Sequence, residues 1–228
     1  MESPSRKRTV RSFVRRTGRM TPGQTRALEE IWPRYGIDLA DDDLDLSDIF
    51  GRAADKVLEI GFGNGDSLVQ MAIENPQLDF LGIEVHEPGV GHCLIAADGA
   101  GLENLRVIIH DAVDVLRQQV RESSLARVNL LFPDPWPKKR HHKRRIFQTD
   151  FLELLATKLR SGGNLYVATD WENYAEHIDD VIARSPGFSL AERREHAGDQ
   201  PLARPRTKFE TRGLQKGHRI WDWRLTLN

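Results

Sequence analysis

The sequence contains one cysteine, Cys93, which excludes an internal disulfide and fits a reducing compartment such as the cytoplasm. It has no run of 18 or more apolar residues, so we expect no membrane-spanning helix. The basic start of the chain lacks the apolar segment that a secretory signal contains. Cys93 precedes Leu94 and Ile95, and these apolar neighbours favour a small core residue over a nucleophile.

The formal net charge is only -1, but the charges are unevenly distributed along the 228 residues. Residues 1–35 carry nine Lys or Arg against three acids, and residues 138–145 carry six Lys or Arg, two His and no acid. Compensating acids cluster elsewhere, at Asp41, Asp42, Asp43, Asp45 and Asp48. Such segregation indicates either a polyanionic partner or a solvated arm and a solvated helix face, and composition alone does not choose between them.

A chain of this length fits one domain with a proper core. We expect a basic arm, a helix and an acidic linker over 1–50, followed by the main domain over 51–228. Residues 1–20 lack apolar periodicity, and Thr21 followed by Pro22 predicts a helix start, with the helix running to about Pro33. The segment from 36 to 51 is expected to be irregular.

From Lys56 onward, short apolar runs alternate with helical patterns. The expected strands are 56–60, 80–85, 106–110, 127–132 and 164–169. The expected helices are 67–74, 89–100, 113–120, 144–159 and 172–184. Apolar strands alternating with helices predict an α/β, Rossmann-like fold with a mostly parallel sheet covered on both faces. Two late segments, 188–193 and 219–227, are candidates for further strands, with an exposed loop between them.

A glycine-rich turn, GFGNG, follows the first expected strand at 61–65. Its glycines permit backbone angles and close approach that a Cβ would block, and Gly61 is a candidate cofactor contact. Glu59 stands just before this turn, where its charge would repel a pyrophosphate but suit an ammonium group. S-adenosylmethionine is a ligand of this kind, because it carries an ammonium, a sulfonium, a ribose and an adenine, and no phosphate.

Two more acids stand at the ends of the next expected strands. Glu84 is placed to bond ribose hydroxyls, and Asp111 is placed to accept from an adenine amino group. Together with Glu59 they would meet at the carboxyl edge of the sheet, where open parallel sheets bind ligands. The alternative is that the three acids only cap helices.

Residues 130–140 read LLFPDPWPKKR, so an apolar run stops at Asp134 between two prolines. The prolines stiffen the loop, Trp136 can stack on a base or cover the core edge, and the basic run can bind phosphate. His141 and His142 lack nearby partners with metal-ligand spacing, and no Ser or Cys has a nucleophile-elbow context. From the acids and the glycine turn we expect S-adenosylmethionine as the methyl donor. From the lack of metal-ligand spacing we expect no metal.

These motifs resemble the bacterial tRNA (guanine-N7)-methyltransferases, a class I S-adenosylmethionine-dependent family, over nearly the whole chain. The matching segments are RSFVR at 11–15, GR at 18–19, LEIGFG at 58–63 with Gly65, FLGIEVH at 80–86, HDA at 110–112, FPDPW at 132–136, KRR at 143–145, ATDWE at 168–172 and TKFE at 207–210. FPDPW together with TKFE is highly specific. Asn64 and Pro137 depart from the family pattern, and Pro137 bears on how Lys138 is aimed.

The resemblance implies methyl transfer to N7 of the variable-loop guanine, position 46 of tRNA, by a cytoplasmic monomer or homodimer. It implies that cofactor contacts are made by Glu59, Glu84, Asp111 and Asp134. It makes Asp134 the catalytic residue as well. It implies that substrate contacts are made by Lys138, Asp170, Thr207, Lys208, Phe209 and Glu210. From the residues alone, Asp170 can equally cap the following helix, and residues 207–210 can form either a substrate lid or an ordinary strand edge.

Two rival interpretations remain open. Amino-group methyltransferases that act on adenine also place an acid or Asn, a proline and an aromatic residue after the fourth strand, as Asp134, Pro135 and Trp136 do here. An RNA-binding module with a vestigial cofactor pocket is the non-enzymatic alternative, and the presence of all four acids and the glycines disfavours it.

Overall fold

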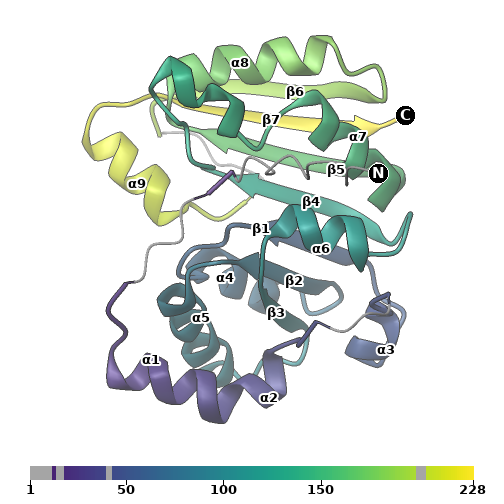
Figure 1. Ribbon diagram of the computed structural model, residues 1–228, viewed down its shortest axis with the longest axis vertical. Coiled ribbons are helices and arrows are strands. Elements are labelled where there is room, and N and C mark those ends of the chain that lie inside the picture. The colour runs from purple at the N-terminus through teal and green to yellow at the C-terminus, as the bar shows by residue number, and fades with distance from the viewer. Residues whose placement is uncertain (1–11, 14–17, 40–42, 199–203) are drawn as a thin grey trace, which may run out of the picture.

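The computed structural model describes residues 12–13, 18–39, 43–198 and 204–228, around a seven-stranded sheet in the order β3-β2-β1-β4-β5-β7-β6 (Figure 1). The strands are β1 Lys56–Ile60, β2 Asp79–Glu84, β3 Leu105–Ile109, β4 Leu125–Leu131, β5 Leu159–Thr169, β6 Phe188–His196 and β7 Ile220–Leu227. Strands β1 to β5 pair in parallel, and β7 lies antiparallel between β5 and β6. The predicted α/β fold with a mostly parallel sheet is confirmed.

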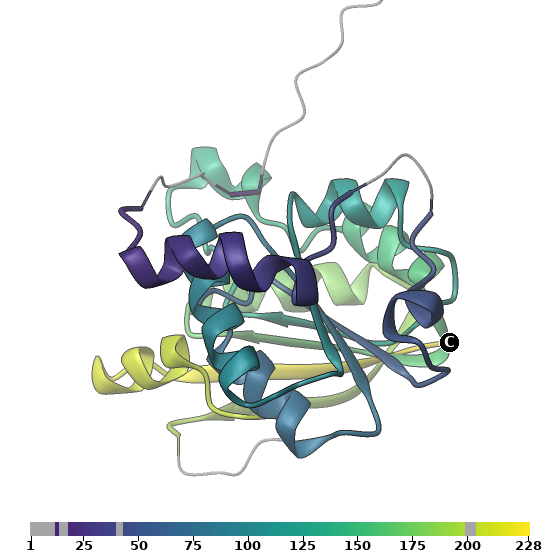
Figure 2. The same ribbon diagram turned by 90° about the horizontal axis from the view of Figure 1, so that it is seen from below.

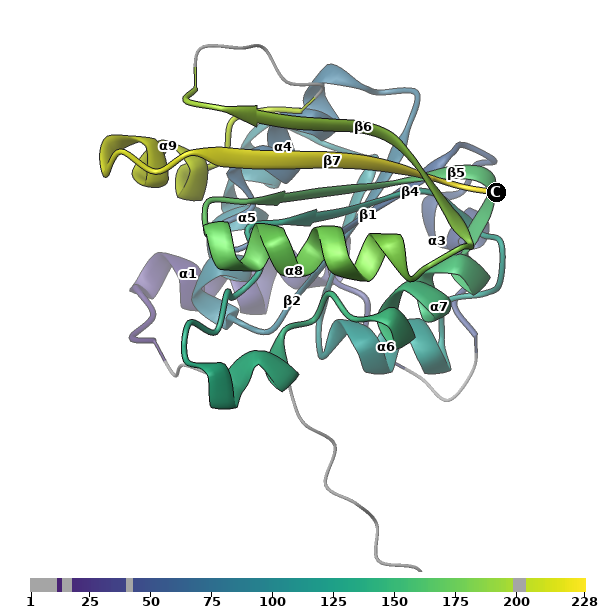
Figure 3. The ribbon, with the colours of Figure 1, turned by 90° about the horizontal axis from the view of Figure 1, so that it is seen from above.

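Helices cover both faces of the sheet, as the views in Figures 1 and 3 agree. They are α4 Asp66–Glu74, α5 Glu87–Gly99, α6 Ala112–Gln118, α7 Thr149–Lys158 and α8 Glu172–Ala183. Alternate strand residues enter two separate cores: Val57 and Phe80 pack with α4 and α5, whereas Leu58 and Leu81 pack with α6, α7 and α8. This alternation explains why the strands are apolar throughout.

The N-terminal helical segment packs on α5 (Figure 2). It comprises α1 Pro22–Arg26, a π-helical turn η1 Ala27–Ile31 and α2 Trp32–Tyr35. Thr21 and Gln24 form a capping box at its start, as Thr21 followed by Pro22 predicts. The segment passes the expected end at Pro33, because Pro33 falls in the first turn of α2, where its missing N–H is tolerated.

Three expectations about local structure are wrong. The segment from 36 to 51 contains a short helix, α3 Leu46–Phe50, which begins where the Asp45 carboxylate accepts from two backbone amides. The helix expected over 144–159 begins at Thr149, because Lys139–Arg144 forms a 3-10 helix, η2, and the backbone is extended at Gln148. The late loop contains a helix, α9 Lys208–Gln215.

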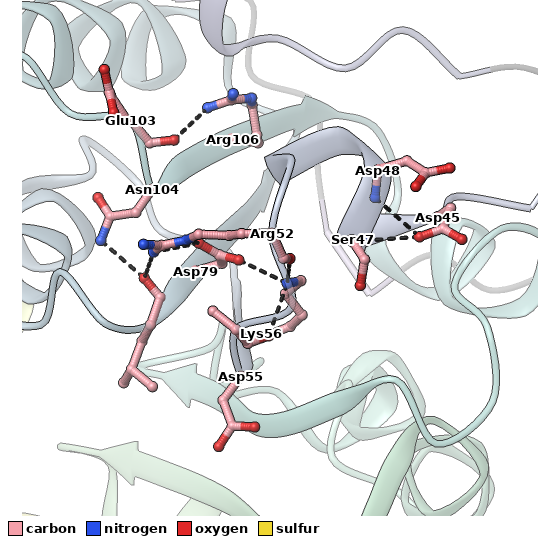
Figure 4. A network of polar contacts seen from close by, with 12 residues as sticks. Asp45, Ser47, Asp48, Arg52, Asp55, Lys56, Asp79, Glu103, Asn104 and Arg106 are labelled. Atoms are coloured by element: carbon pink, nitrogen blue, oxygen red, sulfur yellow. Dashed lines mark hydrogen bonds and ion pairs between the residues drawn. The ribbon is translucent and has the colours of Figure 1, made fainter.

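The carboxyl edge of the sheet is the one where the parallel strands β1 to β5 end. The arrowheads of β1, β4 and β5 point to the side on which α9 lies (Figure 3). The opposite edge, where β1 and β2 start, holds a polar network: buried Asp79 accepts from Lys56 Nζ and Arg52 Nε, both at 2.7 Å (Figure 4). No helix in the described part of the chain is long and apolar enough to cross a membrane.

Candidate active site

The glycine-rich turn after β1 adopts the left-handed backbone that its composition predicts. Gly61, Gly63 and Gly65 have φ angles of 72°, 61° and 80°. At Gly65 there is also no room for a side chain, since an added Cβ would lie 2.5 Å from Cys93 Sγ in α5. The turn therefore brings α4 and α5 close together and leaves an open space above β1. Cys93 is fully buried, as expected of a core residue, and burial raises its pKa to about 12.

Glu59 is buried beside this turn with one oxygen unused. Its Oε1 accepts from Ser67 Oγ at 3.2 Å, and Oε2 has no hydrogen-bond partner among the described residues. Burial raises the pKa of Glu59 to about 7, a shift that the Ser67 hydrogen bond and the nearby cations Arg204 and Arg127 oppose. A buried carboxylate with a free oxygen is costly unless a ligand completes it, and a cationic ligand does so best.

Glu84 and Asp111 use part of their hydrogen-bonding capacity to shape the site. Glu84 accepts from the amide of Gly63 at 2.8 Å, and through its other oxygen from Val85 and His86. Asp111 caps α6 by accepting from the Val113 amide at 3.0 Å. Asp111 therefore caps a helix, but Glu59 does not. The interpretation that all three acids only cap helices is wrong.

One cavity of about 490 Å³ lies above the carboxyl ends of β1, β2, β3 and β4. All five residues predicted to contact the cofactor line it, namely Glu59, Gly61, Glu84, Asp111 and Asp134. Of the predicted substrate residues, Thr207, Lys208 and Phe209 also line it. Lys138, Asp170 and Glu210 are not among the described lining residues. The structure thus brings most of the predicted site together, while three predicted substrate contacts lie outside the cavity.

The loop after β4 holds Asp134 at the mouth of this cavity, with its side chain exposed. Phe132 and Trp136 on either side have left-handed φ angles of 53° and 45°, which are uncommon for bulky residues. Such backbone strain at a loop that lines a cavity fits a functional site. The Phe132 amide donates to the Ala168 carbonyl at 2.8 Å, so the loop remains tied to β5.

Trp136 is engaged within the protein on two sides. Its indole Nε1 donates to the Ser12 carbonyl at 2.9 Å, and the Arg144 guanidinium lies 3.8 Å from the ring centroid. Arg144 also donates to the Phe13 carbonyl at 3.0 Å, and both Ser12 and Phe13 line the cavity. Trp136 therefore joins part of the N-terminal arm to η2. The rest of the expected arm, residues 1–11 and 14–17, lies outside the described residues.

The TKFE segment forms the start of α9, so the strand-edge alternative is wrong. The Thr207 hydroxyl caps α9 by accepting from the Glu210 amide at 3.1 Å. The Glu210 carboxylate is fully buried and accepts from Arg204 at 2.7 Å, and Arg204 also pairs with Asp222 of β7. Phe209 is exposed and lies over the glycine turn, within 3.5 Å of a Cβ added to Gly63. Lys208 and Phe209 are thus the members of this segment that face outward.

Asp170 follows β5 and is paired rather than capping. Its carboxylate contacts His218 Nδ1 at 2.9 Å. No side chain caps the start of α8. The capping alternative for Asp170 is therefore wrong. Lys138 is exposed at the start of η2. Three supporting residues were not predicted from the sequence: Ser67, Arg204 and His218, which contact Glu59, Glu210 and Asp170. Nothing in their spacing links them to those acids.

A parallel sheet with an antiparallel β7, a glycine turn and acids at successive strand ends defines a class I S-adenosylmethionine-dependent methyltransferase. The 16S rRNA methyltransferase KamB has a similar fold, with a TM-score of 0.58 and 16% identity over 86% of this chain and 99% of that chain. TrmN from Thermus thermophilus gives a TM-score of 0.53 with 18% identity over 90% of this chain and 48% of that one. These likenesses establish the fold alone.

Sequence comparison is more specific. The family described as "Putative methyltransferase" matches residues 53–223. A tRNA (guanine-N(7)-)-methyltransferase of Shewanella amazonensis is 55% identical over 94% of this chain and 90% of its own length. One from Nitrosococcus oceani is 54% identical over 96% of this chain and 91% of its own length. The chain belongs to the bacterial tRNA (guanine-N(7)-)-methyltransferase family, as the motifs predict.

Proposed function

We propose that this chain transfers the methyl group of S-adenosylmethionine to N7 of the variable-loop guanine, position 46, of tRNA. The observation that carries the proposal is the cavity at the carboxyl edge, which Glu59, Glu84, Asp111 and Asp134 line together. Relatives more than half identical to this chain are named for the same reaction class. The test is methyl transfer from labelled S-adenosylmethionine to a tRNA transcript, followed by digestion to identify the methylated base.

The residues around the cavity fit the proposed methyl donor. The unused Oε2 of Glu59 suits an ammonium group beside the glycine turn, which leaves room for a ligand to approach the backbone. Glu84 is placed for ribose hydroxyls and Asp111 for an adenine amino group. When bound, the cofactor supplies an electrophilic methyl group on a sulfonium. No step of the proposed chemistry invokes a metal.

The acceptor atom determines what the protein must do. N7 of guanine has an in-plane lone pair and no proton, so no general base is needed to create the nucleophile. The remaining task is to hold N7 in line with the methyl group. As the bond from N7 to the methyl carbon forms, the bond from that carbon to sulfur breaks, so the guanine ring becomes cationic and a neutral thioether leaves. Asp134, exposed at the cavity mouth, orients the base and offsets this growing charge, an interaction that strengthens toward the transition state.

The buried Glu59 predicts a pH dependence of cofactor binding. Its pKa of about 7 means that the unliganded carboxyl is mostly protonated near pH 5.5 and mostly ionised near pH 7.5. Only the ionised form attracts the ammonium, which keeps its own proton below about pH 8. The affinity for S-adenosylmethionine should therefore rise by about tenfold or more over this interval. Calorimetric titration at several pH values checks this.

The matched variant is Glu59→Gln, which keeps the shape and the Ser67 hydrogen bond but cannot ionise. We expect weaker binding with a flat pH profile from about 5.5 to 7.5. A wild-type affinity that does not change with pH would contradict a role for Glu59 as the ammonium partner. So would a Glu59→Gln variant that keeps the wild-type pH slope.

The exposed cations of the basic segment, Lys138, Lys139, Arg140 and Lys143, supply phosphate contacts together with the N-terminal arm. Phosphate contacts add affinity without base information and make binding salt-sensitive. Removal of residues 1–20 should weaken tRNA binding and flatten its salt dependence. Because Ser12 and Phe13 line the cavity, removal of 1–11 alone is the cleaner test of the arm.

The truncation lacking residues 1–11 loses Arg6, Lys7, Arg8 and Arg11 but keeps Ser12 and Phe13. The slope of log affinity against log salt should fall by roughly one unit for each lost cation that contacts phosphate. Cofactor affinity should stay at the wild-type value. Filter binding of tRNA at two or more salt concentrations measures the slope, and an unchanged dissociation constant at each of them would contradict the arm's role.

The adenine amino-group reading predicts a different product from the same cavity, and the digestion step separates the two. The binding-module reading predicts no S-adenosylmethionine affinity. We place the reaction in the cytoplasm, because modification of tRNA is the proposed reaction and the single cysteine is free and buried, as a reducing compartment allows. A monomer or a homodimer is compatible with a cavity that residues of one chain line.

A further inference from the structure

Arg145 is a buried cation at the junction of three segments of the site. Its side chain is almost fully enclosed, with 3% of the residue exposed. Nε donates to the Pro135 carbonyl at 3.0 Å, and the two terminal nitrogens donate to the carbonyl of Asn173 at 3.3 Å and to its Oδ1 at 2.8 Å. A terminal nitrogen also lies 3.2 Å from His142 Nε2. One guanidinium thus joins the loop after β4, η2 and α8.

A residue predicted to act on the substrate lies in, or within two residues of, each of these segments. Pro135 directly follows Asp134, the predicted catalytic residue. His142 lies in η2, which Lys138 precedes, and Asn173 lies in the first turn of α8, which Asp170 precedes. The guanidinium therefore contacts three segments whose positions determine how Asp134, Lys138 and Asp170 lie relative to one another.

The partners of Arg145 are unusual for a buried cation. Among the described residues its recorded contacts include no carboxylate: they are two carbonyls, an amide oxygen, an imidazole and the face of Tyr174 at 4.8 Å. Burial without a counter-charge lowers the pKa of Arg145 from its ordinary value. Removing a cation from water costs free energy, which its hydrogen bonds must offset. An apolar residue cannot replace the guanidinium, because the guanidinium donates hydrogen bonds to partners in different directions.

We propose that Arg145 is a positioning residue of the guanine site, which holds the Asp134 loop in register with the start of α8. This inference rests on the proposed function. Arg145 is too buried to touch tRNA, so it acts through the Pro135 carbonyl and Asn173 rather than on the substrate. Misplacement of a catalytic group by about 1 Å can cost on the order of 10²-fold in rate.

The test is Arg145→Lys, which keeps the charge but has a single nitrogen that cannot reach three partners at once. We expect the single-turnover rate at saturating tRNA and cofactor to fall by about 10- to 100-fold. The dissociation constants of tRNA and S-adenosylmethionine should change by less than about threefold, because neither ligand contacts Arg145. Arg184→Lys, an exposed arginine at the end of α8, is the matched control and should behave as the wild type.

A second variant, Asn173→Ala, removes the 2.8 Å acceptor and keeps the inference testable if Arg145→Lys fails to fold. It should lower the same rate, and the double variant should lose less than the product of the two single losses, because both remove one contact. If Arg145→Lys weakens tRNA binding at an unchanged rate, or leaves all these constants unchanged, the inference is wrong. If the wild type itself does not methylate guanine in tRNA, the proposed function fails instead.

Discussion

Replacement of Asp134 by alanine is expected to lower kcat for tRNA methylation by about 10²- to 10³-fold. The carboxylate is exposed at the mouth of the cavity, on a loop that two prolines stiffen. It meets a guanine whose positive charge appears only as the methyl group transfers, so its loss falls mainly on the transition state. Steady-state methylation with varied tRNA and varied S-adenosylmethionine measures kcat and both KM values.

Asp134→Asn separates orientation from charge, because asparagine keeps an oxygen acceptor in nearly the same shape. A loss close to that of alanine would assign the effect to charge, and a much smaller loss would assign it to orientation. Asp150→Asn, an exposed acid at the start of α7, is the control and should have wild-type constants. If Asp134→Ala changes only the KM for S-adenosylmethionine, Asp134 is a binding residue and its catalytic role is refuted.

Replacement of Asp79 by alanine is expected to destabilise the fold by about 3–5 kcal/mol. Asp79 is fully buried at the start of β2, and it neutralises Lys56, whose side chain is only 5% exposed, as well as Arg52 (Figure 4). Without the carboxylate, Lys56 is a buried charge without its counter-ion. Urea unfolding followed by circular dichroism measures the change in the free energy of unfolding.

Asp55→Ala provides the contrast for Asp79. Asp55 pairs with Arg160 at 2.6 Å, but both side chains are about half exposed, so we expect a loss below about 1 kcal/mol. Because the Asp79 network lies at the edge of the sheet opposite the cavity, cofactor affinity well below the unfolding temperature should be preserved in both variants. Equal small losses in the two variants would show that burial does not decide the strength of these pairs.

Periodicity predicted the sheet well because its strands are buried on both faces. The strand expected at 56–60 is β1 as found, and β2 and β3 are each shifted by a single residue. Errors arose at short helices. The acidic segment that ends in Asp45 and the TKFE segment both carry strong helix starts, a capping Asp and a capping Thr, without a long apolar stripe. Capping without periodicity is a weak signal in a sequence.

The candidate site could be predicted from the sequence where an acidic residue stands at the end of a strand. Glu59, Glu84, Asp111 and Asp134 each stand at such a position, and parallel pairing brings them to one cavity. The sequence does not reveal contacts that arise between distant segments. Arg145 reaches Asn173 across 28 positions, and Arg204 reaches Asp222 across 18, so neither pairing has a local pattern. The supporting contacts of the site therefore require the folded structure.

Guanine-N7 methylation of tRNA is tested most directly by transfer of label from S-adenosylmethionine to an unmodified tRNA transcript. A matched transcript with adenine in place of the variable-loop guanine serves as the control. We predict label on the first transcript, recovered as 7-methylguanosine after digestion, and none on the second. Equal label on both would place the target elsewhere and favour an adenine amino group. No label on either would contradict the proposed activity.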